Sequence, residues 1–260
     1  MRQTNELEDR TPPRSRRPLV IIGIVAVLAV AGLAVAYLTF FNDDAPAPLA
    51  LSDQDPTPSI PAAPAPGAGA AAPTIASSTS DLAGTWRVAS GSEAGYRVRE
   101  KLAALPAQSD AVGRSPAVTG SVNVDRAGGA LTATEASFEV DLTKLTSDES
   151  RRDNRIRTDG LQTNQFPKAT FVSTRPIALP AETASGQVVK AAAEGDLTLH
   201  GVTMRVTIPL DVRVAGGKGE LAGSLRFPMS DFNITPPSIG GFVTVDPDAT
   251  LEFKLILEKG

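Results

Sequence analysis

The stretch VTMRVTIPLDVRV, residues 202–214, decides the class of fold. Apolar side chains occupy every second position from Val202 to Val214, and polar residues together with Pro209 occupy the positions between them. A period of two is that of a β-strand with one face buried and the other in water. Proline lacks a backbone N–H, so we expect Pro209 at a bulge or an unpaired position of this strand.

The same alternation recurs on both sides of this stretch. It places Phe138, Leu197 and Phe253 on apolar faces, and turn signals such as AGGKG at 215–219 separate the runs. The pattern predicts eight or nine strands, each with one apolar face. The fold class is therefore all-β. The residues alone do not decide between an antiparallel sandwich and a closed barrel.

A short helix is the one predicted departure from strands. Ser147 can cap its start, acids fill its first turn, and Gly160 suits its exit. The four arginines at 151, 152, 155 and 157 lie toward its C-terminal end, where the helix dipole favours cations. We expect a solvated helix with internal ion pairs over one end of the β structure; a polar guard at a pocket mouth is the alternative.

The N-terminal part of the chain carries a different signal. Residues 19–41 form an uncharged apolar run, preceded by arginines in segment 1–18 and followed by Asp43 and Asp44. About 20 apolar residues suffice to span a bilayer as a helix. The excess of arginine places segment 1–18 in the cytoplasm and the rest outside, as a single-pass protein of the cell membrane. A cleaved secretory signal is the alternative, although its apolar region is typically shorter.

Residues 42–80 read as a linker. They contain many alanines and prolines and neither lysine nor arginine. Such a segment buries too little apolar surface to offset its ordering entropy, so we expect a disordered tether. The chain then divides into a cytoplasmic tail (1–18), a transmembrane helix (19–41), a disordered linker (42–80) and an extracytoplasmic β domain (81–260).

Composition argues against several classes of function. The chain has no cysteine, which excludes disulfides and thiolate sites, and its 25 basic and 29 acidic residues do not give the basic domain of a nucleic-acid binder. His200, the single histidine, lies at a turn beside Gly201, and no motif marks a nucleophile for it to activate. We therefore expect no enzyme, cofactor, metal or nucleic-acid partner; a hydrolase or isomerase is the least favoured alternative.

Several segments resemble one family. The run RRDNRIRTDGLQTNQFPKATF (151–171) is similar to the central signature of the YceI-like, polyisoprenoid-binding family, through Arg152, Asp153, Phe166, Pro167 and Phe171. The other similar segments, in the family's order, are GYRVRE (95–100), GRSPAVTGSV (113–122), GDLTLHGVTMRV (195–206) and FPMSDFNI (227–234). The resemblance covers about residues 84–259.

The resemblance implies a fold and a ligand. The family fold is a lipocalin-like antiparallel β-barrel of about eight strands, and its members are thought to hold an isoprenoid lipid, such as a quinone, inside it. The chain departs from the common pattern at Glu100, where many relatives have histidine, and at 101–113, which is longer than usual. Alanine-, glycine- and arginine-rich usage indicates a bacterial source.

Candidate site residues follow from the barrel. For each, plain core packing is the alternative to ligand contact, and a filled barrel would make the domain a non-catalytic envelope interaction module. The candidate ligand-binding residues are Tyr96, Val98, Phe138, Val140, Phe171, Leu197, Leu199, Val206, Ile208, Phe227, Phe232, Phe253 and Leu255. Glu100, Arg152, Asp153 and Arg155 are the candidate polar residues at the barrel mouth. Trp86 is expected to plug the start of the barrel.

Overall fold

The computed structural model describes residues 45–52, 82–102, 108–127, 130–237 and 243–260. The expected cytoplasmic tail, and the apolar run expected to span the membrane, lie outside the described residues. Within the described ranges no helix is both long and apolar enough to cross a bilayer.

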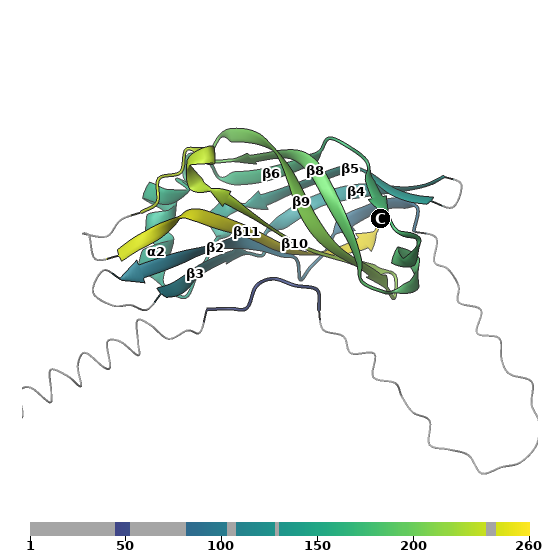
Figure 1. Cartoon of the computed structure of the whole chain (residues 1–260), viewed down its shortest axis with the longest axis horizontal. Coiled ribbons are helices and arrows are strands. Elements are labelled where there is room, and N and C mark those ends of the chain that lie inside the picture. Colours follow the sequence, from purple (N-terminus) through teal and green to yellow (C-terminus); the bar gives the residue numbers. More distant parts are fainter. Residues whose placement is uncertain (1–44, 53–81, 103–107, 128–129, 238–242) are drawn as a thin grey trace, which may run out of the picture. The chain divides into compact units, whose positions relative to one another are not determined.

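The domain is an antiparallel β-barrel (Figure 1). Its strands are β1 (Gly84–Val88), β2 (Glu93–Leu102), β3 (Gln108–Ser115), β4 (Val118–Ala127), β5 (Ala130–Asp141), β6 (Lys168–Ser173), β7 (Ile177–Leu179), β8 (Val189–Leu199), β9 (Val202–Ala215), β10 (Lys218–Pro228) and β11 (Val243–Lys259). They form one sheet in the order β1-β4-β5-β6-β8-β9-β10-β11-β2-β3, with β7 paired to β5. The all-β prediction is confirmed, and of its two forms the barrel is the one observed.

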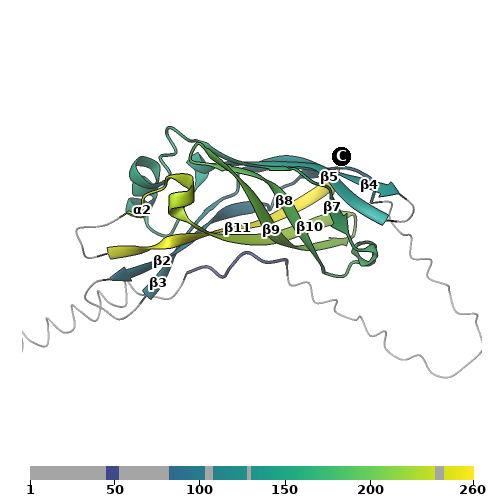
Figure 2. The ribbon, with the colours of Figure 1, turned by 45° about the horizontal axis from the view of Figure 1, so that its top comes forward.

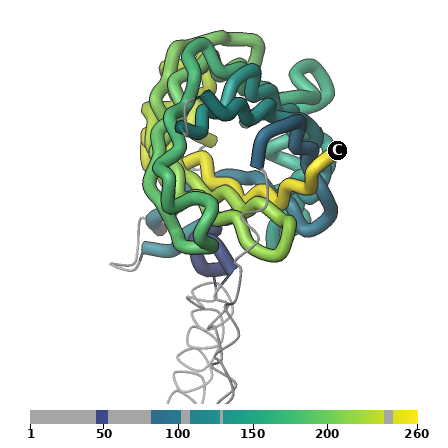
Figure 3. The backbone as a smooth tube through the Cα atoms, turned by 90° about the vertical axis from the view of Figure 1, so that its right-hand side faces the viewer, coloured from purple at the N-terminus to yellow at the C-terminus, as the bar shows by residue number. Residues whose placement is uncertain are grey.

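The long strand β11 closes the barrel. One of its edges pairs with β10 along the whole of β10, from Lys218–Glu258 to Pro228–Asp248. Its other edge pairs with β2 and then, near the C-terminus, with β1, where Trp86 faces Lys259. Because β1 also pairs with β4, the sheet returns on itself and appears as a ring in the end-on view (Figure 3).

Strand β9 has the register that its sequence predicts. Ile208, Leu210 and Val212 are buried, and Thr207 and Pro209, on the two sides of Ile208, are exposed. The registered pairs of β9 with β10 stop at Leu210, so Pro209 lies just beyond that ladder and its missing N–H disrupts no pair there.

One end of the barrel carries the predicted helix. It consists of α2 (Ser150–Arg155) and a π-turn, η2 (Ile156–Gly160), and lies at the end opposite the C-terminus (Figure 2). The helix is capped by Glu149, whose side chain accepts from the Arg151 N–H, rather than by Ser147. Ser147 instead donates its backbone N–H and its hydroxyl to Asp153 Oδ1, at 2.9 and 2.7 Å.

Two apolar clusters fill different parts of the barrel. The first cluster is built around Trp86, Val122, Leu210 and Leu257. The second is built around buried residues such as Phe232, and Ile156 of η2 packs against it. Three short 3₁₀ segments complete the fold: η1 (Leu142–Lys144), η3 (Ala181–Ser185) and η4 (Met229–Phe232). Both clusters extend the inward faces of the strands, as one-sided alternation requires.

Part of the expected linker is held against the barrel. Residues 45–52 have no regular secondary structure, but arginines of three strands donate to their carbonyl oxygens. In this stretch the structure therefore differs from a free tether, because polar groups of the barrel bind its main chain. The remainder of segment 42–80 lies outside the described residues.

Candidate functional site

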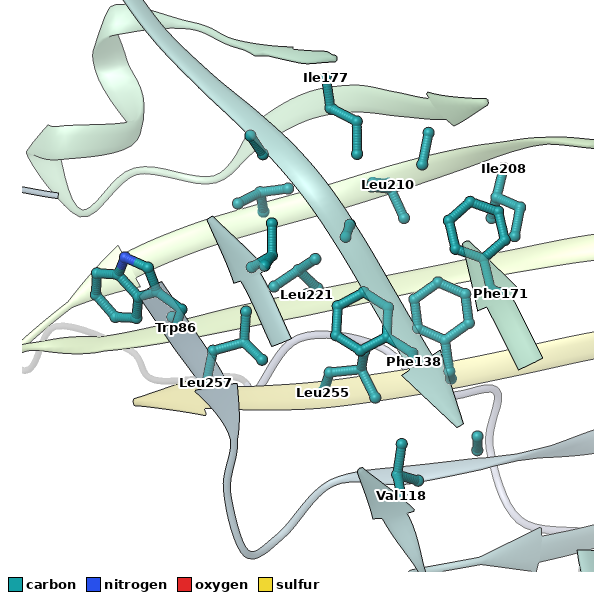
Figure 4. A pocket seen from close by; sticks show the side chains of 18 of the residues that line it. Trp86, Val118, Phe138, Phe171, Ile177, Ile208, Leu210, Leu221, Leu255 and Leu257 are labelled. Carbon is teal, nitrogen blue, oxygen red and sulfur yellow. The ribbon is translucent and has the colours of Figure 1, made fainter. Parts of the chain in front are cut away.

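The first cluster surrounds a cavity of about 140 Å³. Strands β1, β2 and β4–β11, together with η3, contribute to its lining, and Figure 4 shows Trp86 and Leu257 at one end of the row of side chains and Phe171 and Ile208 at the other. None of the described residues that line it carries an ionisable side chain. The cavity is therefore suited to an uncharged hydrocarbon group, because a charge moved there would lose its hydration without gaining a partner.

The candidate ligand residues divide between the cavity and the second cluster. Those that line the cavity are Phe138, Val140, Phe171, Leu197, Ile208, Phe253 and Leu255. Those that pack in or against the second cluster and do not line the cavity are Tyr96, Val98, Leu199, Val206, Phe227 and Phe232. The two groups follow one another along the barrel axis. Inward residues of one strand can therefore belong to either group, as Leu197 and Leu199 of β8 do.

The phenylalanines of the cavity lie against its wall. Each ring rests on a glycine of a neighbouring strand: a Cβ on Gly120 would lie 2.7 Å from the Phe138 ring, one on Gly195 2.4 Å from Phe171, and one on Gly223 2.7 Å from Phe253. The absence of a glycine side chain lets the ring occupy the surface of the sheet. The space inside the barrel consequently stays open at these positions.

Small inward side chains supply the rest of the space. Ala94, Ala133, Ala136 and Ala193 line the cavity and are buried. They are not among the candidate ligand-binding residues chosen from the sequence, although their inward positions in alternating strands are a usable signal. A short side chain at such a position leaves volume that a leucine would fill.

Trp86 also belongs to the lining. Its ring is 4% exposed, its Nε1–H donates to the carbonyl oxygen of Leu82 at 2.9 Å, and it faces Val122 and Lys259 across two strand pairs. The hydrogen bond satisfies the indole without placing a free polar group in the cavity. The expected plug thus lies at the seam where the barrel closes, and it also forms part of the cavity wall.

Thr183 in η3 adds a polar group to this apolar lining. It is completely buried, and its hydroxyl has no hydrogen-bond partner among the described residues. The segment η3 ends beside Val214: a Cβ on Gly186, just after η3, would lie 3.8 Å from the Val214 carbonyl oxygen. Val214 pairs with Gly219, and a Cβ on Gly219 would lie 3.7 Å from the Trp86 ring. Thr183 and Trp86 therefore lie toward the same end of the cavity.

The candidate mouth residues lie at the opposite end and do not line the cavity. Arg152 forms an ion pair with Glu100 at 3.4 Å and with Asp148 one helical turn earlier. Asp153 is bound by Ser147, while Arg155 is half-buried at the end of α2. The second cluster lies beneath this helix, so the bonds of Glu100, Arg152 and Asp153 lie at a barrel end that apolar side chains fill. The ion pairing predicted for the helix is confirmed for Asp148–Arg152.

Tyr96 connects the second cluster with these charges. Its ring covers Gly113, where a Cβ would lie 2.4 Å from it, and burial raises the pKa of the Tyr96 phenol well above its ordinary value of 10.0. The nearby Arg152 lowers this pKa, whereas Asp153 and Glu100 raise it. Burial is the largest of these causes, so Tyr96 stays protonated in the folded barrel.

We expect this phenol to resist titration. In a Tyr37→Phe chain, which leaves Tyr96 as the only tyrosine, the ultraviolet absorbance of phenolate should not appear up to about pH 11 while the protein stays folded. The unfolded chain titrates near pH 10, so unfolding above that pH releases a proton and the free energy of unfolding falls as the pH rises. A phenolate midpoint near pH 10 with an unchanged circular dichroism spectrum would contradict the burial of Tyr96.

His200 has a structural position, as its place at a turn predicts. With Gly201 it forms the turn between β8 and β9, and both residues have positive φ, 50° and 74°. Its Nδ1 lies 3.0 Å from the carbonyl oxygen of Phe232, and its ring meets Phe166 edge-on at 4.5 Å. The imidazole thereby joins the hairpin to η4 and to the segment after α2. Over the described part of the chain, no group of three or more metal-ligating side chains is found.

The fold and the site together define a class: a closed antiparallel β-barrel with an apolar cavity inside it. Within that class, the YceI-like domain family matches residues 86–257, most of the described barrel. The chain belongs to this family, which confirms the resemblance of its sequence segments.

Curated relatives support the same assignment. A UPF0312 protein of Vibrio campbellii is 36% identical over 120 residues, which cover 44% of this chain and 59% of that protein. A UPF0312 protein of Pseudomonas putida is 32% identical over 127 residues, covering 46% of this chain and 62% of that protein. The chain thus matches about three fifths of the length of these relatives.

A solved structure shares the fold. A polyisoprenoid binding domain from Saccharophagus degradans, implicated in plant cell wall breakdown, superposes with a TM-score of 0.51 at 16% identity and covers 68% of this chain and 99% of that domain. At this identity the likeness concerns the fold alone.

Proposed function

We propose that the barrel binds the hydrocarbon tail of a polyisoprenoid or similar long-chain amphiphile, an isoprenoid quinone being one such lipid. The observation that carries this proposal is the cavity, which lies inside the barrel and has no ionisable side chain among its described lining residues. Each CH₂ group that leaves water for such a cavity contributes about 0.8 kcal/mol. Tail binding by partition needs no catalytic group, and we propose a binding protein rather than an enzyme.

The proposed ligand carries an uncharged polar end. A phosphate in the cavity would find no cationic side chain among the described lining residues, whereas for a carbonyl or hydroxyl the single hydrogen bond of the unpartnered Thr183 hydroxyl is sufficient. The ion pair of Arg152 and Glu100 lies beyond the second apolar cluster, so we place the ligand's polar end near Thr183 and not on the α2 side.

The volume of the cavity limits what enters without rearrangement. An apolar cavity of roughly 150 Å³ in another protein takes up benzene. A long tail exceeds such a volume, so its binding requires the rings of Phe138, Phe171 or Phe253 to change rotamer, or the tail to leave through one barrel end. This is consistent with phenylalanines that are only partly buried and rest on glycines.

We further propose that residues 19–41 anchor the protein as a single span, with the barrel on the extracytoplasmic side. The length of the apolar run and the arginines before it support this arrangement. An alkaline-extraction test of the native membrane, with proteolysis of intact spheroplasts, would check it. Extraction of the intact chain, or protection of the barrel from external protease, would contradict it.

Native mass spectrometry of the full chain tests the lipid. We expect a stoichiometric adduct whose mass after solvent extraction matches a prenyl quinone or a polyprenol, and quinone binding that quenches the fluorescence of Trp86, the only tryptophan. Prenyl phosphates of equal tail length are the control for the uncharged end, and we expect them to bind more weakly. An apo mass that persists after incubation with every such lipid would favour the interaction module with a filled barrel.

A further inference from the structure

The outer face of the barrel holds a segment of the chain that precedes it. Arg97 of β2 donates to the carbonyl oxygen of Pro46 at 2.6 Å, Arg114 of β3 to that of Ala47, and Arg213 of β9 to that of Ser52 at 2.7 Å. These three contacts lie at both ends of the eight-residue segment, which runs along the barrel (Figure 1, purple).

The surface under this segment is unusual for the outside of a barrel. Glu252 points away from the cavity, yet it is only 2% exposed, and it accepts from Arg97 Nε at 3.3 Å and from Arg114 Nη2 at 3.2 Å. Arg114, Gly95 and Glu252 stand in one row across β3, β2 and β11. Because Gly95 has no side chain, the Arg114 guanidinium can cross it and reach Glu252.

After the ion pairs of this surface are made, N–H groups of the arginines remain available to a peptide. Asp110 pairs with both Arg97 and Arg99, at 3.1 and 3.4 Å, and Arg114 also lies 4.0 Å from Glu93. Three carboxylates therefore pair with three guanidinium groups. A guanidinium has five N–H donors and no acceptor, so donors remain after the ion pairs are made. Carbonyl oxygens of an extended segment are available partners, because such a chain makes no internal hydrogen bonds, and Pro46 and Pro48 favour that conformation.

We infer that residues 45–52 are an intrachain docking peptide, which we call the clasp, recognised through its main-chain carbonyls by Arg97, Arg114 and Arg213. The clasp fixes the chain to the barrel immediately after residue 44. Residues 53–81 then join Ser52, which is bound to the barrel, to Leu82 at its start. They therefore do not contribute to the distance between the barrel and residue 44.

One consequence rests on the proposed membrane anchor. Only residues 42–44 separate the apolar run from the clasp, and at about 3.5 Å per residue they extend roughly 10–15 Å. A free linker of residues 42–80 would instead allow roughly 35 Å as a flexible coil. The clasp therefore limits how far the barrel can move from the end of the span.

Pulsed electron-spin distance measurements on the full chain test the clasp directly. The chain has no cysteine, so nitroxide labels at Ala50→Cys and Thr207→Cys, both exposed positions, report the distance from the clasp to β9. We expect one narrow distance distribution. Arg213→Ala should broaden it severalfold, whereas Arg205→Ala, which removes an exposed arginine of the same strand that pairs with Asp196, should leave it unchanged.

Three results would overturn the inference. They are a broad distribution in the doubly labelled parent chain, a distribution equally narrow after Arg213→Ala, and a narrow distance that arises only between two singly labelled chains, which would assign the clasp to a second copy. None of these depends on lipid, so the clasp and the proposed lipid function can fail separately.

Discussion

Ala193→Phe is expected to abolish tail binding while leaving a folded barrel. Ala193 is 4% exposed and lines the cavity from β8, opposite Ile208. A phenylalanine ring there has about the size of the benzene that a comparable cavity holds, so it takes the volume that a tail would use. If about four CH₂ groups lose their burial, the loss is about 3 kcal/mol, which is on the order of a hundredfold in affinity.

The neighbouring residue provides the matched control. Ala192 is exposed on the outer face of the same strand, opposite Pro209, so Ala192→Phe adds the same ring outside the barrel. Binding is measured by quenching of Trp86 fluorescence, and folding by far-ultraviolet circular dichroism. Ala193→Leu fills less space and covers the case in which the larger ring prevents folding. Full binding by a folded Ala193→Phe barrel would show that the ligand site lies elsewhere.

Trp86→Ala is expected to cause the largest loss of stability among single substitutions in the cavity wall. It removes a buried ring at the strand pairs that close the barrel, together with the hydrogen bond to Leu82. Truncation of a buried tryptophan typically costs about 3–5 kcal/mol. For a domain of this size that corresponds to a fall in melting temperature of roughly 10 °C.

Trp86→Phe separates the two contributions. It retains most of the buried ring and loses the hydrogen bond to the Leu82 carbonyl, so it should cost about 1–3 kcal/mol, less than the alanine variant. Thermal unfolding followed by circular dichroism compares both variants with the parent chain. Equal melting temperatures for Trp86→Ala and the parent would mean that the seam between β1 and β11 contributes little to stability.

Sequence alternation predicted which side chains point inward, but it could not divide them along the barrel axis. Phe138 and Phe227 both occupy apolar positions of strands, yet the first lines the cavity and the second belongs to the second apolar cluster. The difference depends on register: Gly120 stands directly opposite Phe138 and accommodates its ring. Such cross-strand pairs are fixed by strand order, which no local pattern contains.

The clasp escaped prediction for a related reason. The composition of segment 42–80 is typical of disorder, and nothing in residues 45–52 themselves marks a bound peptide. Their partners, such as Arg97 and Arg213, lie far away in the sequence and meet them only after the sheet has closed. Arg152 of α2 had the opposite outcome, because its partner Asp148 is four residues away and was visible in the sequence.

The place of β11 at the seam also constrains when the protein can be assembled. This strand pairs with β10, β2 and β1, and it is the last strand of the barrel in chain order. Contacts between the two ends of a domain form slowly, since a long loop must close before they stabilise anything. Until β11 has been synthesised, the inward faces of the earlier strands remain uncovered and prone to aggregate. Loss of the last residues of β11, where Lys259 pairs with Trp86, would therefore leave the barrel open at the seam between β1 and β11.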